Sequence, residues 1–268
     1  MRYELTPEFE KKQTIMRSYG GSLSDALLLL KRIEALRPED LHARPAELTV
    51  SEYAGGRLLI GLQNTEFLCE RNGSEPDLLR LLDIAQYVEI PMFSHGLPHK
   101  DPNRRDEINP AINPNINPRL NNDLNPRIHV DLNPNVNTDL NPRINPDLNP
   151  VRNLALNYKV EPEINPRMND RINPNINKFI NPKLNRLFDG LFVYDLDNTH
   201  TAFTVRADDR VTLFFDMENE FASIGVRNES GGHTLFDLNF EWTGFTVPDG
   251  QGGFVRFDLE AEWTGYLV

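Results

Sequence analysis

Ile108-Asn109-Pro110-Ala111, Ile112-Asn113-Pro114-Asn115 and Ile116-Asn117-Pro118-Arg119 begin a run in which one four-residue unit occurs twenty times, through residue 187. The first position of the unit is Ile, Leu, Val or Met in every copy except the one with Arg152. The second is Asn except at His129 and Glu161, and the third is Pro in twelve copies. Spacing without insertions makes the units geometrically equivalent, which is typical of repeat architectures and unusual for the middle of an enzyme.

The Pro residues limit the conformation of this array. An α-helix is excluded because each Pro lacks an amide hydrogen and clashes with the preceding turn, at about 3 kcal/mol apiece. A regular strand is disfavoured because a four-residue period with Pro inside does not match the two-residue pleat. Asn-Pro instead favours a type I turn. The dipeptide and its spacing resemble the turn repeats of malaria sporozoite coat proteins, which implies one bend per unit. The repeat positions expected to form these bends include Asn109, Asn113, Asn117, Asn125, Asn133, Asn141, Asn145 and Asn149.

The aliphatic position favours a folded array over a flexible tract, since each exposed side chain would forgo roughly 1.5–3 kcal/mol. We therefore predict a β-solenoid or turn-rich rod with the aliphatic column inside and the Asn side chains in ladders. It is similar in logic to pentapeptide-repeat solenoids. The alternative is an extended, disordered Asn/Pro tract. Pro126, Pro134, Pro142 and Pro150 lie eight residues apart, with variable residues between them, which indicates that the true repeat is an octad.

Charge and composition divide the chain into parts. We expect a helical domain over residues 1–94, a linker over 95–107, the array over 108–187 and a four-stranded β module over 188–268. The net charges of residues 1–107, 108–187 and 188–268 are −4, +3 and −11. Such acidity in the last part argues against nucleic acid as a partner. The single Cys69 fits a reducing compartment. Without a visible signal peptide or an apolar run that could span a membrane, we expect a cytoplasmic protein, although signal-less export stays open.

The N-terminal part is predicted to be mostly helical. Thr6 to Tyr19 is expected to form a first helix with Thr6 as its cap, and a second helix is expected from Ser22, where a capping box starts, to Arg37, where Pro38 ends it. A third helix is expected to start at Ser74 and to present an apolar stripe through Ala85, whereas residues 51–70 are ambiguous. Residues 95–107 are rich in Gly, Pro and charge, so we expect a solvated linker in place of a metal site. The metal ligands would have been His95, His99 and Asp101.

A second repeat, with a period of 21 residues, fills the C-terminal part. It places one carboxylate in each copy, at Asp195, Asp216, Asp237 and Asp258. Alternating apolar and polar residues predict four long strands in an antiparallel β-meander with an acidic face and an aromatic face. Trp242 and Trp263 fall on the aromatic face, where packing in the core is favoured over a role as sugar-stacking platforms. Ca²⁺ on the acidic face is an alternative that no known loop pattern supports.

Leu191 to Thr199 resembles the first motif of haloacid-dehalogenase-type phosphatases. The resemblance implies Asp195 as the phosphorylated nucleophile, Asp197 as the general acid and an adjacent Mg²⁺. That family builds this motif into a doubly wound core and also needs a Lys, yet no Lys follows Thr199. Because Asp195 aligns with the other three repeat carboxylates, a strand position is favoured over a nucleophile.

The sequence therefore predicts a mostly β, non-enzymatic structural or protein-interaction repeat protein with no catalytic, cofactor or metal residues. We expect it to self-associate into an oligomer or filament through solenoid ends or strand edges. The alternatives are a solenoid that binds or inhibits a partner protein, and the phosphatase.

Overall fold

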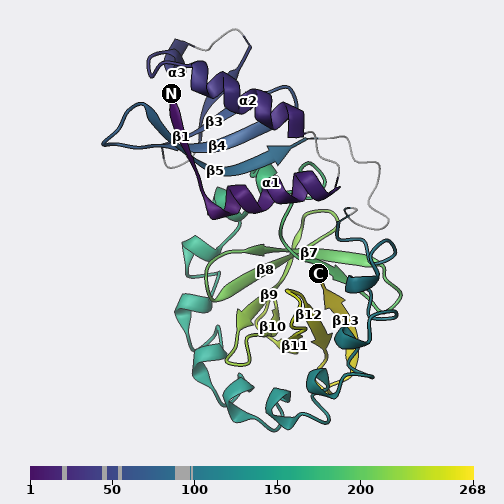
Figure 1. Ribbon diagram of the computed structural model, residues 1–268. Coiled ribbons are helices and arrows are strands. Elements are labelled where there is room, and N and C mark those ends of the chain that lie inside the picture. Colours follow the sequence, from purple (N-terminus) through teal and green to yellow (C-terminus); the bar gives the residue numbers. More distant parts are fainter. Residues whose placement is uncertain (20–22, 44–46, 54–55, 88–96, 98) are drawn as a thin grey trace. The chain divides into compact units, whose positions relative to one another are not determined.

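A computed structural model describes the chain except residues 20–22, 44–46, 54–55, 88–96 and 98 (Figure 1). Contacts divide it into two compact units. Unit 1 comprises Met1–Pro91 and Lys178–Asp189, and unit 2 comprises Met92–Asn177 and Gly190–Val268. The structure is mostly β, as predicted, and most of its strands lie in unit 2. None of the helices in the described residues is long and apolar enough to cross a membrane.

Unit 1 is a five-stranded sheet with helices, so the prediction of a mostly helical domain over residues 1–94 is wrong. The helices α1 (Pro7–Tyr19) and α2 (Leu23–Ala35) lie where the sequence predicted them, followed by α3 (Asp40–Ala43). Ser22, part of the expected capping box, lies outside the described residues. The sheet order is β1-β5-β4-β3-β2, in which only the β1–β5 pair is parallel. Its strands are β1 (Arg2–Leu5), β2 (Thr49–Tyr53), β3 (Arg57–Leu62), β4 (Thr65–Arg71) and β5 (Leu78–Gln86).

The third predicted helix is a strand, β5. Leu79 and Leu81 are fully buried and flank the exposed Arg80, the two-residue alternation of a strand. The apolar stripe from Leu78 to Ala85 is compatible with the 3.6-residue period of a helix and with the two-residue period of a strand. The segment forms a strand because it pairs with β1 and β4. Phe9 of α1 packs edge-on against Phe67 of β4 at 5.0 Å between ring centroids, so the helices cover one face of the sheet.

Residues 99–107 belong to unit 2, and three of them are buried there, which contradicts the solvated linker. Asp101 is 3% exposed, and its carboxylate accepts the amide of Asn103. His99 is also buried, and the hydroxyl of Tyr194 donates to the carbonyl of Lys100. His95 lies outside the described residues.

The C-terminal part forms a closed eight-stranded antiparallel barrel in place of the four-stranded meander. Each 21-residue copy supplies two strands because the chain turns sharply after the repeated Asp. Asp237 Oδ1 accepts the amides of Asn239 and Glu241, both at 2.8 Å, and Phe240 has a φ of 67°. The strands are β6 (Phe192–Tyr194), β7 (His200–Arg206), β8 (Val211–Asp216), β9 (Phe221–Arg227), β10 (His233–Asp237), β11 (Trp242–Pro248), β12 (Phe254–Phe257) and β13 (Trp263–Leu267).

The barrel has two apolar faces. Its inner face follows the 21-residue period, with Val193, Phe214 and Leu235 clustering across strands that are not neighbours. Gly244 lies beside this layer, where a Cβ would come within 2.3 Å of the carbonyl oxygen of Phe257. The outer face carries a ring of large side chains in the same period. One layer of that ring is Tyr194, Phe215, Phe236 and Phe257.

The array covers this outer face. Its short 3₁₀ turns follow one another in an arc around the barrel strands (Figure 1). Leu124 packs in one cluster with Phe245, Val247 and Phe257. The 3₁₀ turns η1–η10 each span three residues and recur every eight: Asp106–Ile108, Pro114–Ile116, Asn122–Leu124, Val130–Leu132, Thr138–Leu140, Pro146–Leu148, Leu154–Leu156, Pro162–Ile164, Asp170–Ile172 and Lys178–Ile180. A hydrogen-bonded turn lies between each pair.

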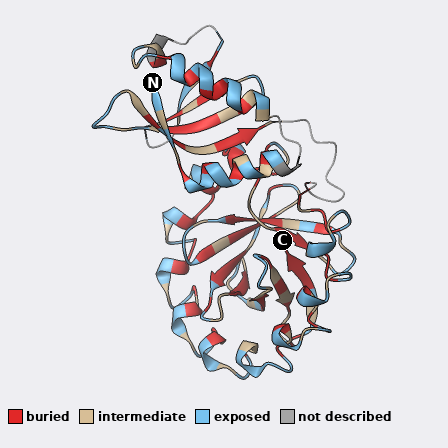
Figure 2. Ribbon diagram, viewed as in Figure 1, coloured by how far each residue is buried: buried red, intermediate tan, exposed pale blue. Residues whose placement is uncertain are grey.

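The β-solenoid with an internal aliphatic column is not what forms. Residues 108–184 are all described, and none lies in a β-strand. Aliphatic side chains alternate between buried and exposed, as the burial colours along the arc show in Figure 2. The physical reason is that the barrel provides the apolar partner, so one aliphatic residue per octad faces it. The inward residues are Ile116, Leu124, Leu132, Leu140, Leu148, Leu156, Ile164 and Ile172.

Candidate interaction surface

Half of the aliphatic residues of the array point away from the barrel. We call the following residues the outer column: Ile112, Leu120, Ile128, Val136, Ile144, Val160, Met168 and Ile176. They are 55% to 68% exposed and recur every eight residues, with Arg152 in the one interrupting position. A single exposed aliphatic residue is ordinary, whereas eight that recur at a fixed spacing along the outside of the arc are unusual for residues that meet only solvent.

The Pro alternation has the same origin as the outer column. In the turn of each octad the third position of the unit is buried, as at Pro118, Pro126 and Pro134. The matching position of the intervening unit is exposed, as at Asn122 and Val130. Pro is therefore kept where it packs against the barrel and varies where it meets solvent, which explains the eight-residue period seen in the sequence.

The repeated Asn residues cap turns, and no stacked ladder of their side chains is seen in the array. Asn145 shows the arrangement: its Oδ1 accepts the amide of Asp147 at 3.0 Å, and its Nδ2 donates to the carbonyl of Asp139 at 2.8 Å. The first bond is the Asx turn that Asn favours, and the second joins successive octads. In the same way, the side-chain Oδ1 accepts the backbone amide of the residue two positions later at Asn109, Asn113, Asn117, Asn125, Asn133, Asn141 and Asn149.

Basic residues of the array lie over the acidic end of the barrel. Arg127 forms an ion pair with Glu262 and donates to the carbonyl of Glu260. The guanidinium carbons of Arg119 and Arg143 lie 5.2 and 5.4 Å from the ring centroids of Trp263 and Trp242. Both indoles thus pack beneath array cations and donate to their own strands, at 2.9 Å to Gly265 and Gly244. The opposite charges of the two parts therefore meet within unit 2.

All four repeat carboxylates are turn residues. Asp195, Asp216 and Asp258 accept amides two and four residues onward, as Asp237 does. The expected continuous acidic strand face is therefore absent at these positions. Asp195 is followed by an antiparallel hairpin, and residues 200–268 form barrel strands where the phosphatase resemblance implied a doubly wound core. Among the described residues, no group of three His, Cys, Asp or Glu side chains is placed to hold a metal ion.

Sequence reasoning missed two buried histidines. His200 occupies the repeat position of Trp242 and Trp263, and its Nε2 makes the same contact, at 2.8 Å to the carbonyl of Ala202. Burial lowers the pKa of His200 to about 4. Burial, aided by the charge of Arg227, also lowers the pKa of His233 to about 4. Comparing residues 200, 242 and 263 in the 21-residue alignment could have identified His200 as a packing position.

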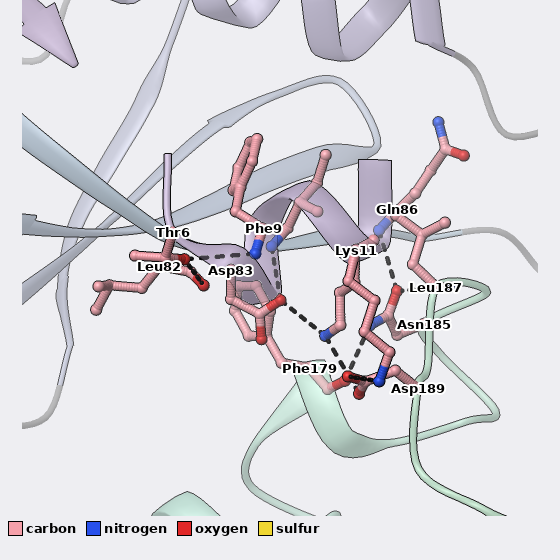
Figure 3. A network of polar contacts seen from close by, with 12 residues as sticks. Thr6, Phe9, Lys11, Leu82, Asp83, Gln86, Phe179, Asn185, Leu187 and Asp189 are labelled. Atoms are coloured by element: carbon pink, nitrogen blue, oxygen red, sulfur yellow. Dashed lines mark hydrogen bonds and ion pairs between the residues drawn. The ribbon is translucent and has the colours of Figure 1, made fainter. Parts of the chain in front are cut away.

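A buried charge network holds residues Lys178–Asp189 in unit 1 (Figure 3). The ammonium group of Lys12, 2% exposed, lies 2.7 Å from Asp83 and 3.7 Å from Asp189. Burial alone would lower the pKa of Lys12, but these two carboxylates outweigh it and raise it. Nearby, Asn185 Oδ1 accepts the amide of Gln86. The ammonium group of Lys12 is buried between two partly exposed carboxylates, and the network joins three segments of the fold, which fits a structural role.

No protein-family model matches the chain, and no curated protein or solved structure is significantly similar to it.

Proposed function

We propose that the protein is a non-enzymatic structural protein that associates with itself through the outer column. The observation that carries the proposal is the row of eight aliphatic side chains, each more than half exposed, at a fixed spacing of eight residues. The inward residues are held by the barrel, whereas nothing within the described chain covers the outer ones. Burying an exposed aliphatic side chain contributes roughly 1.5–3 kcal/mol, so even part of the row could support association.

This proposal replaces strand edges and solenoid ends as the contact surfaces in unit 2. A closed barrel has no free edge strand, and the array pairs with no strand there. The outer column remains as the exposed, repeated apolar feature of that unit.

Charge supports a second copy of the chain as the partner. The residue just before a column residue is often basic, as at Arg127 before Ile128 and Arg143 before Ile144. The residue three positions after a column residue is often acidic, as at Asp131 and Asp147. Arg127 contacts the Asp258 end of the barrel, and the carbonyl of Asp147 contacts Arg210 at the other end. A copy rotated by 180° about the direction of the column therefore places basic residues against acidic ones.

Sedimentation velocity over a range of protein concentrations tests the proposal. The test variant carries Ile128→Asp, Val136→Asp and Ile144→Asp, and the control adds the same charge at exposed positions off the column. The control substitutions are Asn122→Asp, Thr138→Asp and Leu154→Asp. We expect the wild type and the control to associate as concentration rises and the column variant to remain monomeric with an unchanged circular dichroism spectrum. A wild type that is monomeric throughout, or a column variant that associates as well as the wild type, would refute the proposal.

A further inference from the structure

The basic residues of the C-terminal part are concentrated at one place. Residues 188–268 contain four Lys or Arg residues against fifteen Asp or Glu. Three of the four, Arg206, Arg210 and Arg227, line a single pocket of about 190 Å³ at the mouth of the barrel. The pocket lies between the turn that joins β7 to β8 and the turn that joins β9 to β10. Such clustering against a strongly acidic background is unexpected for a surface that only keeps the barrel soluble.

The 21-residue repeat does not require these arginines. The position of Arg206 and Arg227 is occupied by Pro248 in the next copy. The position of Arg210 is occupied by Gly231 and Gly252. Since the corresponding turns form without arginine, the three side chains are additions to the fold at this one pocket.

Two of the three guanidinium groups lack a carboxylate partner. Arg206 pairs with Asp209, and the Asp208 carboxylate accepts the amides of its own turn. Arg210 donates to a backbone carbonyl, that of Asp147, at 2.6 Å. Arg227 makes no side-chain hydrogen bond or ion pair with any residue in the described parts of the chain. The lining therefore carries uncompensated positive charge, which favours an anion.

The inner end of the pocket offers a hydroxyl donor. The Thr246 hydroxyl accepts the amide of His233 at 2.9 Å and lies 3.3 Å from His233 Nδ1. The other ring nitrogen, Nε2, lies 3.3 Å from the hydroxyl of Thr212. Thr212 and His233 both line the pocket, so the Thr212 hydroxyl lies where it can donate to a bound anion.

We propose that this pocket binds a small tetrahedral oxyanion, either phosphate or a phosphate monoester, between Arg227 and Arg210, with Thr212 as a further donor. Guanidinium groups match phosphate oxygens in paired, charge-assisted hydrogen bonds, and a hydroxyl donor completes the set. The pocket is also large enough for such an ion. This site is independent of the outer column, so it stands or fails separately from self-association.

Titration of the full-length protein with inorganic phosphate, followed by calorimetry and by the NMR signal of the His233 ring, tests the proposal. Parallel titrations with glycerol phosphate and with acetate, at constant ionic strength, identify the anion class. We expect saturable binding of phosphate or its monoester that is weakened about tenfold or more by Arg227→Gln and by Arg210→Gln. Arg171→Gln is the matched control, since Arg171 is exposed and distant in sequence from the pocket lining.

Unfolding curves followed by Trp fluorescence show whether each variant keeps a folded barrel, because both Trp residues lie in it. The proposal is overturned if phosphate gives no saturable response in the wild type, if acetate binds as well as phosphate, or if folded Arg227→Gln binds phosphate like the wild type. Tighter binding of glycerol phosphate than of phosphate would identify a monoester as the ligand class, and the reverse order would identify phosphate itself.

Discussion

Replacing Ile116 by Ala tests the burial pattern of the array against a control four residues away. Ile112 and Ile116 both precede Asn-Pro, so the four-residue repeat treats them alike. In the structure Ile116 is 3% exposed and Ile112 is 57% exposed. Removing a buried Ile side chain costs about 2–5 kcal/mol through lost burial and a residual cavity. The same truncation at the exposed position should change the free energy of unfolding by no more than about 0.5 kcal/mol.

Urea unfolding followed by Trp fluorescence measures this difference for unit 2. Trp242 and Trp263 are the two Trp residues of the chain, and both report on the barrel that the array covers. We expect Ile116→Ala to lower the unfolding midpoint clearly and Ile112→Ala to leave it nearly unchanged, with the same dependence on urea in both. Equal losses in the two variants, or a larger loss for Ile112→Ala, would contradict the assignment of inward and outward residues.

Three further predictions concern charged and titratable groups. Arg256→Leu should raise the free energy of unfolding of unit 2 by about 1–3 kcal/mol, measured by urea unfolding. Burial lowers the pKa of Arg256, and its side chain has no ion-pair partner among the described residues. The other three copies of the 21-residue repeat have an apolar residue at this position. A destabilised Arg256→Leu would show that the cation is needed. Lys12→Met should destabilise unit 1 by about 3 kcal/mol, the lower end of the range for a broken buried pair, because it leaves the partly exposed carboxylates of Asp83 and Asp189 without their cation. Lys11→Met, at a side chain that is 61% exposed, should cost less than about 1 kcal/mol; circular dichroism would measure both, and equal effects would refute the buried network. The pKa values of His200 and His233, about 4 when folded, lie below the usual 6.5. Between pH 6.5 and 4 the unfolded chain therefore binds more protons than the folded chain. The free energy of unfolding should be unaffected by these histidines above pH 6.5 and should fall as the pH drops towards 4. His200→Trp should make the urea midpoint less sensitive to pH over this range, and an unchanged pH dependence would contradict this.

The sequence predicted the eight-residue period of the array, but it did not predict which aliphatic residues would be buried. Pro126, Pro134 and Pro142 indicated the octad, and the structure shows why Pro recurs there. It could not predict that Ile112 and Ile116 have opposite exposure, because nothing local distinguishes them. That difference depends on the outer face of the barrel, whose strands begin at residue 192. The exposed outer column therefore consists of residues that the sequence placed in the interior of the array.

The sequence shows the 21-residue C-terminal repeat, but it predicts one long strand per copy where the structure has two strands joined by a turn. Phe236, Phe240 and Trp242 fit one apolar alternation, so a single long strand was expected. Phe240 instead has a positive φ, which an aromatic residue rarely adopts and which no local pattern indicates. The bonds of Asp237 to two amides hold this turn. In unit 1, the stripe from Leu78 fitted helix and strand alike, and only pairing across the sheet decided it.

A single-cysteine scan along the aliphatic positions of the array tests the central claim most directly. Native Cys69 is fully buried and burial strongly raises the pKa of its thiol, so it should stay unreactive towards maleimide and serve as an internal control. At low protein concentration we expect fast labelling at residues 112, 120, 128 and 144 and slow labelling at 116, 124, 140 and 148. At high concentration the first set should become protected by association. Uniform labelling along the array, or a pattern without the eight-residue alternation, would contradict the account.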